Sequence, residues 1–214
     1  MSLRGGRHGD RRSNLLFKID CFASLAMTAF VSLSNLTSAH AATYKIDPEH
    51  SAVAFHIHHL IGKVTGHFDR FQGTVDYEAG RPAAWKTSAT IEAASINTQS
   101  AKRDTHLRSE DFFDVEKYPT IAFQSTGVTD VQGSHAKLHG KLTMHGVTKP
   151  VVLDLEVGGV AKDPWGGTHA AFMATAKLDR RDYGVEWNQA VEGGGVLIGN
   201  EVELELDIEG IPQT

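Results

Sequence analysis

Cysteine is almost missing from this 214-residue sequence, which contains a single one, Cys21. That residue lies within the first 41 residues, and the rest of the chain has no cysteine at all. Disulfide bonds therefore cannot stabilise the part after residue 41. Thiolate nucleophiles and thiolate metal ligands are excluded there for the same reason.

Long apolar runs are also scarce, and the clearest one, residues 21–36, has the setting of a leader. It follows a basic start, lacks charged residues and precedes the small-residue pattern Ala39-His40-Ala41. This arrangement is typical of a secretory signal peptide, and the run is too short and too rich in Ser for a comfortable membrane span. We predict that residues 1–41 are a cleaved signal peptide and that residues 42–214 form one domain. A retained N-terminal anchor is the alternative.

Basic residues are in the minority once this leader is removed. The leader holds five of the 21 Lys and Arg residues and two of the 26 Asp and Glu residues, which leaves 16 basic and 24 acidic residues and a formal charge of −8. Such a balance argues against a nucleic-acid partner. It also argues against binding to an anionic membrane through charge alone.

Common catalytic signatures are absent as well. The sequence contains no G-x-S-x-G, no H-E-x-x-H and no glycine-rich phosphate loop with its Lys. Ser51 follows His50 directly, and neighbours on a strand point to opposite faces, so they cannot form a nucleophile–base pair there. We therefore expect a protein that is not an enzyme. A metalloenzyme built on the histidines is the alternative.

The dominant pattern is an alternation of apolar and polar residues with a period of two. This period is typical of half-buried antiparallel strands, and Gly, Asn and Asp at the joints supply turns. The pattern predicts eight or nine strands within nine segments, residues 51–57, 63–69, 71–77, 87–93, 120–126, 137–146, 151–157, 169–179 and 200–210.

A charged stretch without this alternation, residues 98–118, interrupts the strands before Pro119. It predicts one or two short helices around residues 99–116, crossing an opening of the sheet. Glycines at positions 66, 73 and 140 lie inside predicted strands, where they often mark bends or close backbone approach. We therefore predict a mainly β fold in which the sheet closes into a barrel, which removes its exposed edges. A two-sheet sandwich is the alternative.

Four segments together resemble the YceI-like family of secreted, lipocalin-like proteins. They are "YKIDPEHSAVAFHIHHLIGKVTGHFDRFQGTV" (44–75), "DTHLRSEDFFDVEKYPTIAFQST" (104–126), "GKLTMHGVTKPVVLDLEV" (140–157) and "LDRRDYGV" (178–185). The resemblance covers residues 44–210, with the motifs in the family's order. The "DFF…YP" and "LT-x-HGVTKPV" blocks are its most specific parts.

The resemblance implies an extended eight-stranded antiparallel, lipocalin-like barrel in the bacterial periplasm. It also implies an apolar lumen that binds a long-chain isoprenoid lipid, either a polyprenyl phosphate or an isoprenoid quinone, for transport or sequestration. A fatty acid or a fatty amide is the alternative ligand. No catalytic activity and no cofactor other than the bound lipid are implied. A transient contact with the inner membrane and a homodimer stay open as further interactions.

Strand parity and the resemblance together select the residues expected to face the lipid. The alternative is that the same side chains simply fill a solid core, as in many small barrels. Phe112 and Tyr118 accompany one member of the set, Phe113, and either cap the cavity or anchor the crossing segment. The predicted lipid-facing residues are Val53, Phe55, Ile57, His59, Phe68, Ile91, Phe113, Phe123, Leu142, Phe172 and Leu178.

Five polar residues within the matched motifs are candidates for the head group or the mouth of the barrel. An Arg among them would suit a phosphate through charge-assisted hydrogen bonds. For Arg180 and Asp182 we favour a structural role, an ion pair that fixes a loop at a strand exit, and His106 alternatively satisfies backbone groups. The candidates are His50, His106, Arg108, Arg180 and Asp182.

The cluster "HIHH" contains two further histidines, His56 and His58, which share one face of a strand. Two imidazoles at this spacing can chelate zinc or copper if a third ligand comes from elsewhere, such as His67, His135, His139 or His145. If Phe55 and Ile57 face inward, however, His56 and His58 face solvent. We therefore predict no metal site, and we expect these two histidines to contribute least.

Overall fold

The computed structural model describes residues 41–191 and 195–213. Residues 1–40, which make up nearly all of the predicted signal peptide, lie outside the described residues, so cleavage after Ala41 stays a prediction. No helix in the described part is long and apolar enough to cross a membrane.

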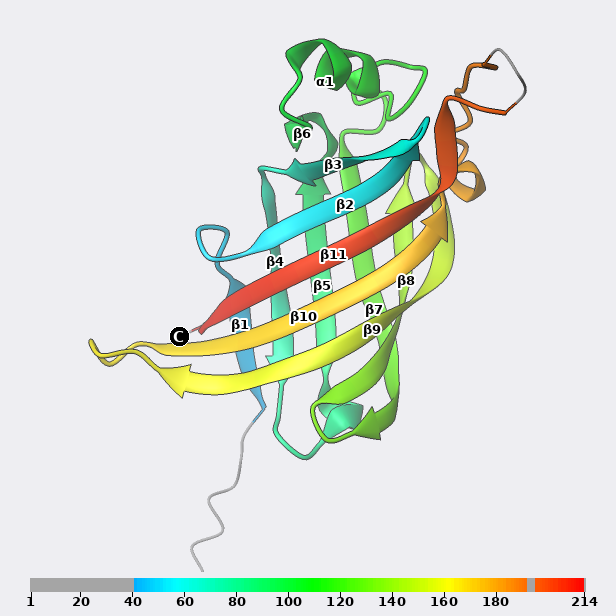
Figure 1. Ribbon diagram of the computed structural model, residues 1–214. Coiled ribbons are helices and arrows are strands. Elements are labelled where there is room, and N and C mark those ends of the chain that lie inside the picture. The colour runs from blue at the N-terminus through cyan, green and yellow to red at the C-terminus, as the bar shows by residue number, and fades with distance from the viewer. Residues whose placement is uncertain (1–40, 192–194, 214) are drawn as a thin grey trace, which may run out of the picture. The chain divides into compact units, whose positions relative to one another are not determined.

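The described strands form one antiparallel sheet with the order β1-β4-β5-β7-β8-β9-β10-β11-β2-β3-β6 (Figure 1). Each of the nine predicted segments lies within a strand or extends at most two residues beyond its ends, and β1 and β6 are additional. β1 was missed because its five residues follow the predicted cleavage site directly, and β6 because it has only two residues. The strands are β1 (Ala42–Ile46), β2 (Ala52–His59), β3 (Gly62–Phe68), β4 (Phe71–Tyr77), β5 (Lys86–Glu92), β6 (Ile96–Asn97), β7 (Thr120–Gln132), β8 (His135–Met144), β9 (Val147–Lys162), β10 (Thr168–Asp179) and β11 (Ile198–Pro212).

The sheet closes through β1, which pairs with β4 on one side and with the end of β11 on the other. At this closure Tyr44 faces Pro212 and Ile46 faces Gly210. The ring β1-β4-β5-β7-β8-β9-β10-β11 is therefore an eight-stranded antiparallel barrel, which confirms the predicted fold. The sandwich alternative is wrong, because a closed ring of hydrogen-bonded strands leaves no second sheet.

β11 has 15 residues, so one of its edges is long enough to pair with two strands, one after the other. Beyond its pairing with β1, its first part pairs with β2, and the sheet continues from there to β3 and β6. In this register Val202 faces Ile57 and Leu204 faces Phe55. The β2–β3 hairpin thus extends the barrel wall beyond the ring, and its apolar residues face the interior of the same barrel.

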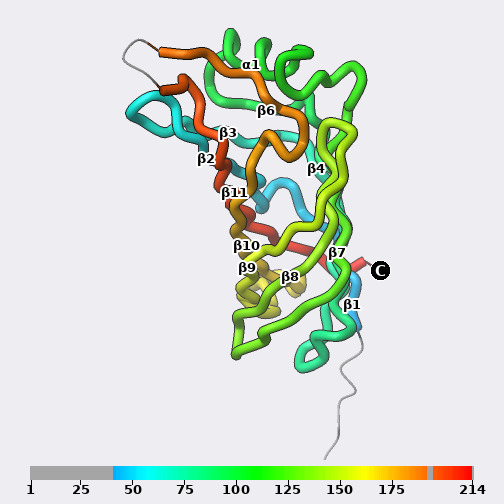
Figure 2. Tube along the Cα trace, turned by 90° about the vertical axis from the view of Figure 1, so that its right-hand side faces the viewer, coloured from blue at the N-terminus to red at the C-terminus, as the bar shows by residue number. Residues whose placement is uncertain are grey.

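One α-helix, α1 (Ala101–Arg108), lies in the predicted interruption, and residues 109–117 form turns rather than a second helix. The remaining helical turns are η1 (Pro82–Ala84), η2 (Ala93–Ser95) and η3 (Arg180–Tyr183). Both views place α1 at one end of the barrel, called here the α1 end (Figures 1 and 2). The helix is almost entirely polar apart from Leu107, which packs against the core, so polar contacts must supply most of its anchoring.

Candidate functional site

The barrel interior contains a cavity of about 760 Å³. All eleven residues predicted to face a lipid line this cavity. Other wall residues were not predicted. Some of them lie on short or irregular segments, and the apolar residues of β11 were predicted to form a strand but were not assigned to the wall. Lining residues of this kind are Ile46, Trp85, Trp187, Leu204, Leu206 and Ile208.

The interior is hollow rather than a solid core. Phe55, Ile57, Ile91 and Phe123 lie on the inner face of the wall, yet each is only half-buried. Side chains in a packed core lose nearly all of their accessible surface, because interiors are as dense as organic crystals. The surface left on these inward residues therefore faces the cavity, where an apolar ligand could cover it.

Two glycines help to keep the cavity open, because large rings lie where their side chains would be. A Cβ on Gly66 would overlap the ring of Phe55, and a Cβ on Gly140 would overlap the ring of Phe123. Each ring therefore packs directly over a glycine of the wall. Glycines inside strands predict a close approach of other groups to the backbone. Here the groups that approach the glycine backbone are aromatic side chains.

Aromatic contacts connect the wall to the segment that covers the α1 end. The Phe68 ring centroid lies 5.8 Å from that of Phe55 and 6.0 Å from that of Phe113. Phe112 is buried and its ring lies 5.2 Å from Trp187, and both residues line the cavity. The two phenylalanines therefore cap the cavity and anchor the segment at once.

Tyr118 does not line the cavity. Its ring packs 4.7 Å from that of His145, and it occupies the space beside Gly146, which has a positive φ of 75°. Of the two roles considered for this tyrosine, the structure supports anchoring of the crossing segment.

His106 lies at the α1 end and lines the cavity. Its ring lies 4.8 Å from Trp187 and 5.0 Å from Phe112, and its Nε2 is 2.8 Å from the carboxylate of Asp111. The imidazole is therefore engaged with side chains. These contacts do not support the alternative in which the His106 imidazole forms hydrogen bonds with backbone groups.

The first turn of α1 contributes cavity-lining residues that sequence reasoning overlooked, Ser100, Lys102 and Arg103. Arg103 is held in place, since its Nε donates to the Thr98 hydroxyl and its Nη2 to the Thr98 carbonyl, both at 2.7 Å. Thr98 is fixed in turn by Asp104, which accepts from its backbone N–H at 2.9 Å and from its hydroxyl at 2.5 Å. The only signal in the sequence was a basic pair inside a charged helix, which is usually a solvated surface.

Arg108 was a mouth candidate, and this placement is wrong. Its side chain lies outside the cavity lining and donates to the carbonyls of Ala94 and Ile96, each at 2.7 Å. The guanidinium thereby fastens the end of α1 to the segment before it. A polar helix needs such an anchor, which is the physical reason for an Arg at this position.

Arg180 touches the cavity, but its guanidinium is engaged elsewhere. It is buried, with 4% of its surface exposed, and donates to the carbonyls of Val185 at 2.7 Å, Trp187 at 2.9 Å and Gly199 at 3.0 Å. Burial lowers the pKa of the Arg180 guanidinium below its usual value. The structural role favoured for this residue is therefore supported, although carbonyls rather than a carboxylate are its partners.

Asp182 is exposed, lies outside the cavity lining and forms no ion pair with Arg180 in the described part of the chain. The ion pair of this turn instead joins Asp179 and Arg181, at 2.6 Å. Arg181 donates hydrogen bonds to Asp179 and lowers the pKa of that carboxyl to about 2. The predicted loop lock thus has different partners, and Asp182 is not a mouth residue.

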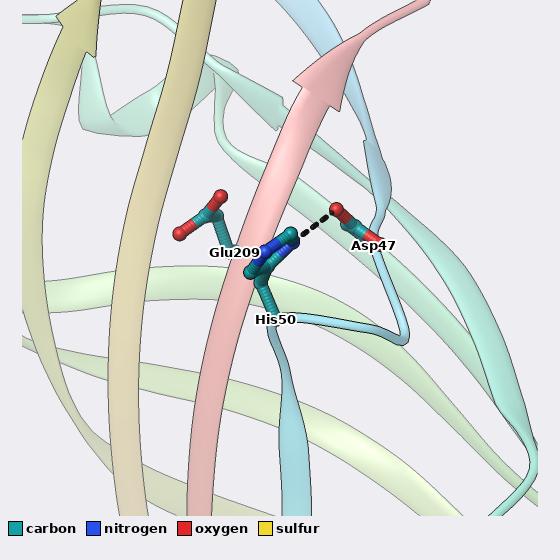
Figure 3. Close-up of side chains that lie close together, drawn as sticks. All are labelled: Asp47, His50 and Glu209. Atoms are coloured by element: carbon teal, nitrogen blue, oxygen red, sulfur yellow. Dashed lines mark hydrogen bonds and ion pairs between the residues drawn. The ribbon is translucent and has the colours of Figure 1, made fainter. Parts of the chain in front are cut away.

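His50 was the remaining mouth candidate, and it also lies outside the cavity lining. It lies with Asp47 on the β1–β2 turn and Glu209 on β11 (Figure 3), and Asp163 and His169 of the β9–β10 hairpin extend this group. Its Nδ1 is 2.8 Å from Asp47, and Glu209 lies beside the pair. We call Asp47, His50, Asp163, His169 and Glu209 the His169 network.

The His169 network alternates acids and imidazoles. His169 Nε2 lies 3.0 Å from Asp163, and its Nδ1 lies 2.8 Å from Glu209 in an ion pair that lacks hydrogen-bond alignment. The hydrogen bond that His169 donates to Asp163 raises the pKa of His169, and the hydrogen bond that His50 donates to Asp47 raises the pKa of His50.

The ligand atoms of Asp47, His50 and Glu209 lie within 4.8 Å of one another, a spacing that a metal ion could use. In this structure the same side chains are already paired, His50 with Asp47 at 2.8 Å and Glu209 with His169 at 2.8 Å. The contacts therefore describe a set of paired charges at the surface.

The two outer histidines of "HIHH" are separated from the cavity as strand parity predicted. His56 pairs with Thr65 at 2.9 Å and with Glu205 at 2.8 Å, and His58 is exposed. Neither belongs to the metal-type cluster of the described residues. Only His59 of this stretch lines the cavity together with Phe55 and Ile57.

Comparisons with known proteins agree with this architecture. The family model described as YceI-like domain matches residues 44–210. A UPF0312 protein of Photorhabdus laumondii is 40% identical over 190 residues, which cover 87% of this chain and 95% of that protein.

Two solved structures share the fold. The YceI protein of Campylobacter jejuni is 30% identical, with a TM-score of 0.64 over 73% of this chain and 90% of that one. A domain from Saccharophagus degradans, described as polyisoprenoid binding, is 16% identical, with a TM-score of 0.60 over 81% of this chain and all of the other. Both likenesses show that this chain has the fold of these structures.

Proposed function

Since this chain belongs to the YceI-like family, we propose that it binds a long-chain isoprenoid lipid in its barrel and transports or sequesters it in the periplasm. The observation that carries the proposal is the cavity of about 760 Å³, whose wall is formed by half-buried apolar side chains. Its volume lies in the range of small-molecule sites, which are concave and mostly apolar.

Burial of the tail supplies ample free energy for such binding. Each buried CH₂ contributes roughly 0.8 kcal/mol, so one five-carbon isoprene unit contributes about 3–4 kcal/mol when it is fully desolvated. Several units would exceed the ceiling of about −20 kcal/mol for non-covalent affinities, and the excess is lost to ordering and incomplete burial. An apolar wall is therefore sufficient to hold the tail without a covalent or metal bond.

An isoprenoid is favoured over the other ligands by the likeness to the Saccharophagus domain, whose description names polyisoprenoid binding. A fatty acid or fatty amide is the second candidate, because the wall selects for apolar surface rather than for branching. A metalloenzyme has less support. The metal-type cluster of the described residues lies outside the cavity and consists of charges that already pair with one another.

Lipid exchange with the inner membrane would need an apolar surface near the cavity, and the β2–β3 turn supplies one. Ile61 is fully exposed, and Leu60 and Val196 are exposed beside it. The Leu60 N–H donates to the carbonyl of Leu197, which lines the cavity. This tip therefore continues the cavity wall toward the surface, and it contacts the bilayer when lipid enters or leaves.

Native extraction tests the binding function. The protein is purified gently from its own envelope and extracted with organic solvent for mass spectrometry, and its metal content is measured in parallel. A stoichiometric prenyl lipid is expected. Stoichiometric zinc or copper without lipid would overturn the proposal in favour of a metalloprotein, and a fatty acid or amide would replace the isoprenoid by the second candidate.

Vesicle sedimentation tests the membrane contact. Leu60→Ser/Ile61→Ser should bind less to phosphatidylethanolamine vesicles than the unaltered protein does. Val131→Ser/Val152→Ser removes two exposed valines elsewhere and is the matched control. Equal sedimentation of the two double variants would refute a contact through the β2–β3 turn.

A further inference from the structure

The charges on the cavity wall are unevenly distributed. The only carboxylate among the described lining residues is Asp76, on β4, which accepts a hydrogen bond of 2.6 Å from Thr43. Lys102, Arg103 and Arg180 are the permanent cations on the wall, and the α1 end carries the first two. The whole domain is acidic, so a cationic section of the cavity wall is not a consequence of composition.

These cations differ in how far their hydrogen-bonding groups are engaged. Arg180 is buried and donates to three carbonyls. Lys102 and Arg103 are exposed, and neither forms an ion pair within the residues that the structure describes. Arg103 uses Nε and Nη2 on Thr98, which leaves the two N–H groups of Nη1 for another acceptor.

A solvated helix surface would account for two exposed cations, but not for the way one of them is held. Asp104, only 7% exposed, fixes Thr98 through two hydrogen bonds, and Thr98 fixes Arg103 through two more. A side chain that only interacts with water needs no such support. A guanidinium held beside a cavity is pre-organised for a ligand group, because its ordering cost is already met by the fold.

Ser100 adds a neutral donor at the same place. It precedes α1 and lines the cavity, yet its hydroxyl makes no capping hydrogen bond to the helix. A hydroxyl, an ammonium and a guanidinium thus border one apolar cavity. Guanidinium groups match the oxygens of phosphate and carboxylate, and charge-assisted bonds to these groups are stronger than neutral ones.

We infer that Lys102 and Arg103, with the Ser100 hydroxyl, bind the oxyanion of an acidic amphiphile whose tail fills the cavity. The inference rests on the proposed lipid-binding function and specifies its ligand class. A prenyl phosphate or a fatty acid has the required head group, whereas a quinone or a fatty amide does not. Phosphate and carboxylate share this chemistry, and the experiment separates them.

The test compares four C18 ligands that have the same tail, oleyl phosphate, oleate, oleyl alcohol and oleamide. The protein as its producing cell makes it is stripped of lipid, and dissociation constants are measured by calorimetry at pH 8, where the carboxylate is ionised. We expect the two anions to bind about 10-fold more tightly than the two neutral ligands. This preference should shrink at high salt, because the cations are exposed.

A double variant assigns the preference to the two residues. Lys102→Met/Arg103→Met should bind the anions no more tightly than the alcohol, while its affinity for the alcohol stays unchanged. Lys141→Met/Lys149→Met removes the same charge from exposed positions on β8 and β9 outside the cavity lining, and it should keep the preference. Oleyl phosphate and oleate are then ranked against each other to choose between phosphate and carboxylate.

Equal affinity of the unaltered protein for all four ligands would overturn the inference and leave the lipid-binding function standing. Retention of the preference by Lys102→Met/Arg103→Met would overturn it as well. Failure of all four ligands to bind, with no lipid in the native extract, would overturn the lipid-binding function and this inference together. The salt and head-group comparison on the unaltered protein needs no variant, so a folding defect of the double variant leaves that part of the test intact.

Discussion

The α1 end of the barrel and the His169 network both carry several charged side chains, but they use them differently. In the network, each histidine lies within 3.0 Å of a carboxylate, and His50 lies outside the cavity lining. At the α1 end, Lys102 and Arg103 border the cavity and form no ion pair among the described residues. Paired charges need nothing further, whereas unpaired charges beside an apolar cavity are where a ligand's head group would be bound.

This difference matters more than residue type for the assignment of function. His50 and Arg108 belong to motifs of the family resemblance, yet their side chains are engaged with Asp47 and with backbone carbonyls, respectively. Lys102 and Arg103 were not among the site residues predicted from the sequence, but their charged groups remain available to a ligand. The following changes test this comparison between the α1 end, the cavity and the network.

The largest expected effect comes from a charge placed on the cavity wall. Phe55→Asp should lower the affinity for oleyl phosphate more than 100-fold, because its carboxylate would have to be desolvated by the tail or would repel the head group. Calorimetry measures the affinity, and circular dichroism verifies the fold. His56→Asp changes the next residue, which faces the outside, and is the control. Unchanged binding by a folded Phe55→Asp protein would show that the inner face is wrongly assigned.

Arg180→Met tests whether a cavity cation that is engaged with the backbone is structural. The change removes the hydrogen bonds to three backbone carbonyls and to the Asn200 side chain, and it leaves the buried Val185 carbonyl without this donor, which should lower the free energy of unfolding by about 2–4 kcal/mol. Urea unfolding measures this loss. The neighbouring Arg181→Met affects only an exposed pair with Asp179 and should leave the urea midpoint nearly unchanged. Equal midpoints for the two variants would contradict the structural role.

Asp104→Asn tests whether the support behind Arg103 matters for binding. An amide oxygen accepts less strongly than a carboxylate, and its N–H₂ group competes for the same position, so Thr98 and then Arg103 should lose their fixed placement. We expect the preference for oleyl phosphate over oleyl alcohol to fall about 3-fold. Asp111→Asn, on the exposed partner of His106, is the control. A preference that survives Asp104→Asn would show that Arg103 needs no support.

The barrel wall could be predicted from the sequence because, in a strand, odd-numbered and even-numbered residues point to opposite faces of the sheet. A period of two places Phe55, Ile57 and His59 on one side whatever the strand's neighbours are. Ten of the eleven predicted wall residues follow from this local rule together with the family resemblance, whereas Phe113 lies in the crossing segment. The hollow interior does not follow from it, since filled and hollow barrels share the same alternation.

The polar end of the site could not be predicted, because its geometry depends on contacts between distant backbone and side-chain atoms. The partners of Arg180 are carbonyls of residues 185, 187 and 199, which no pattern in the sequence identifies. Lys102 and Arg103 lie on a helix without an apolar face, so periodicity gives no direction for their side chains. Motif membership indicated that His50 and Arg108 matter, but it did not indicate where they point.

The smallest expected effect concerns the pH dependence of stability, which the His169 network should control without affecting the ligand. The pKa of His169 is raised above 6.5 by its hydrogen bond to Asp163, so its contribution is complete below pH 6.5 and is lost as the pH rises through the raised value. Asp163 has a pKa lowered below 3.8 by the same bond, and its contribution is lost as the pH falls through that value. The network therefore stabilises the fold most between about pH 4 and pH 6.5.

His169→Asn should lower the urea midpoint at pH 5.5 more than at pH 8.5 and leave the affinity for oleyl phosphate unchanged. A loss of affinity would show that the network is coupled to the cavity, and the contrast between paired and unpaired charges would then no longer separate structure from binding.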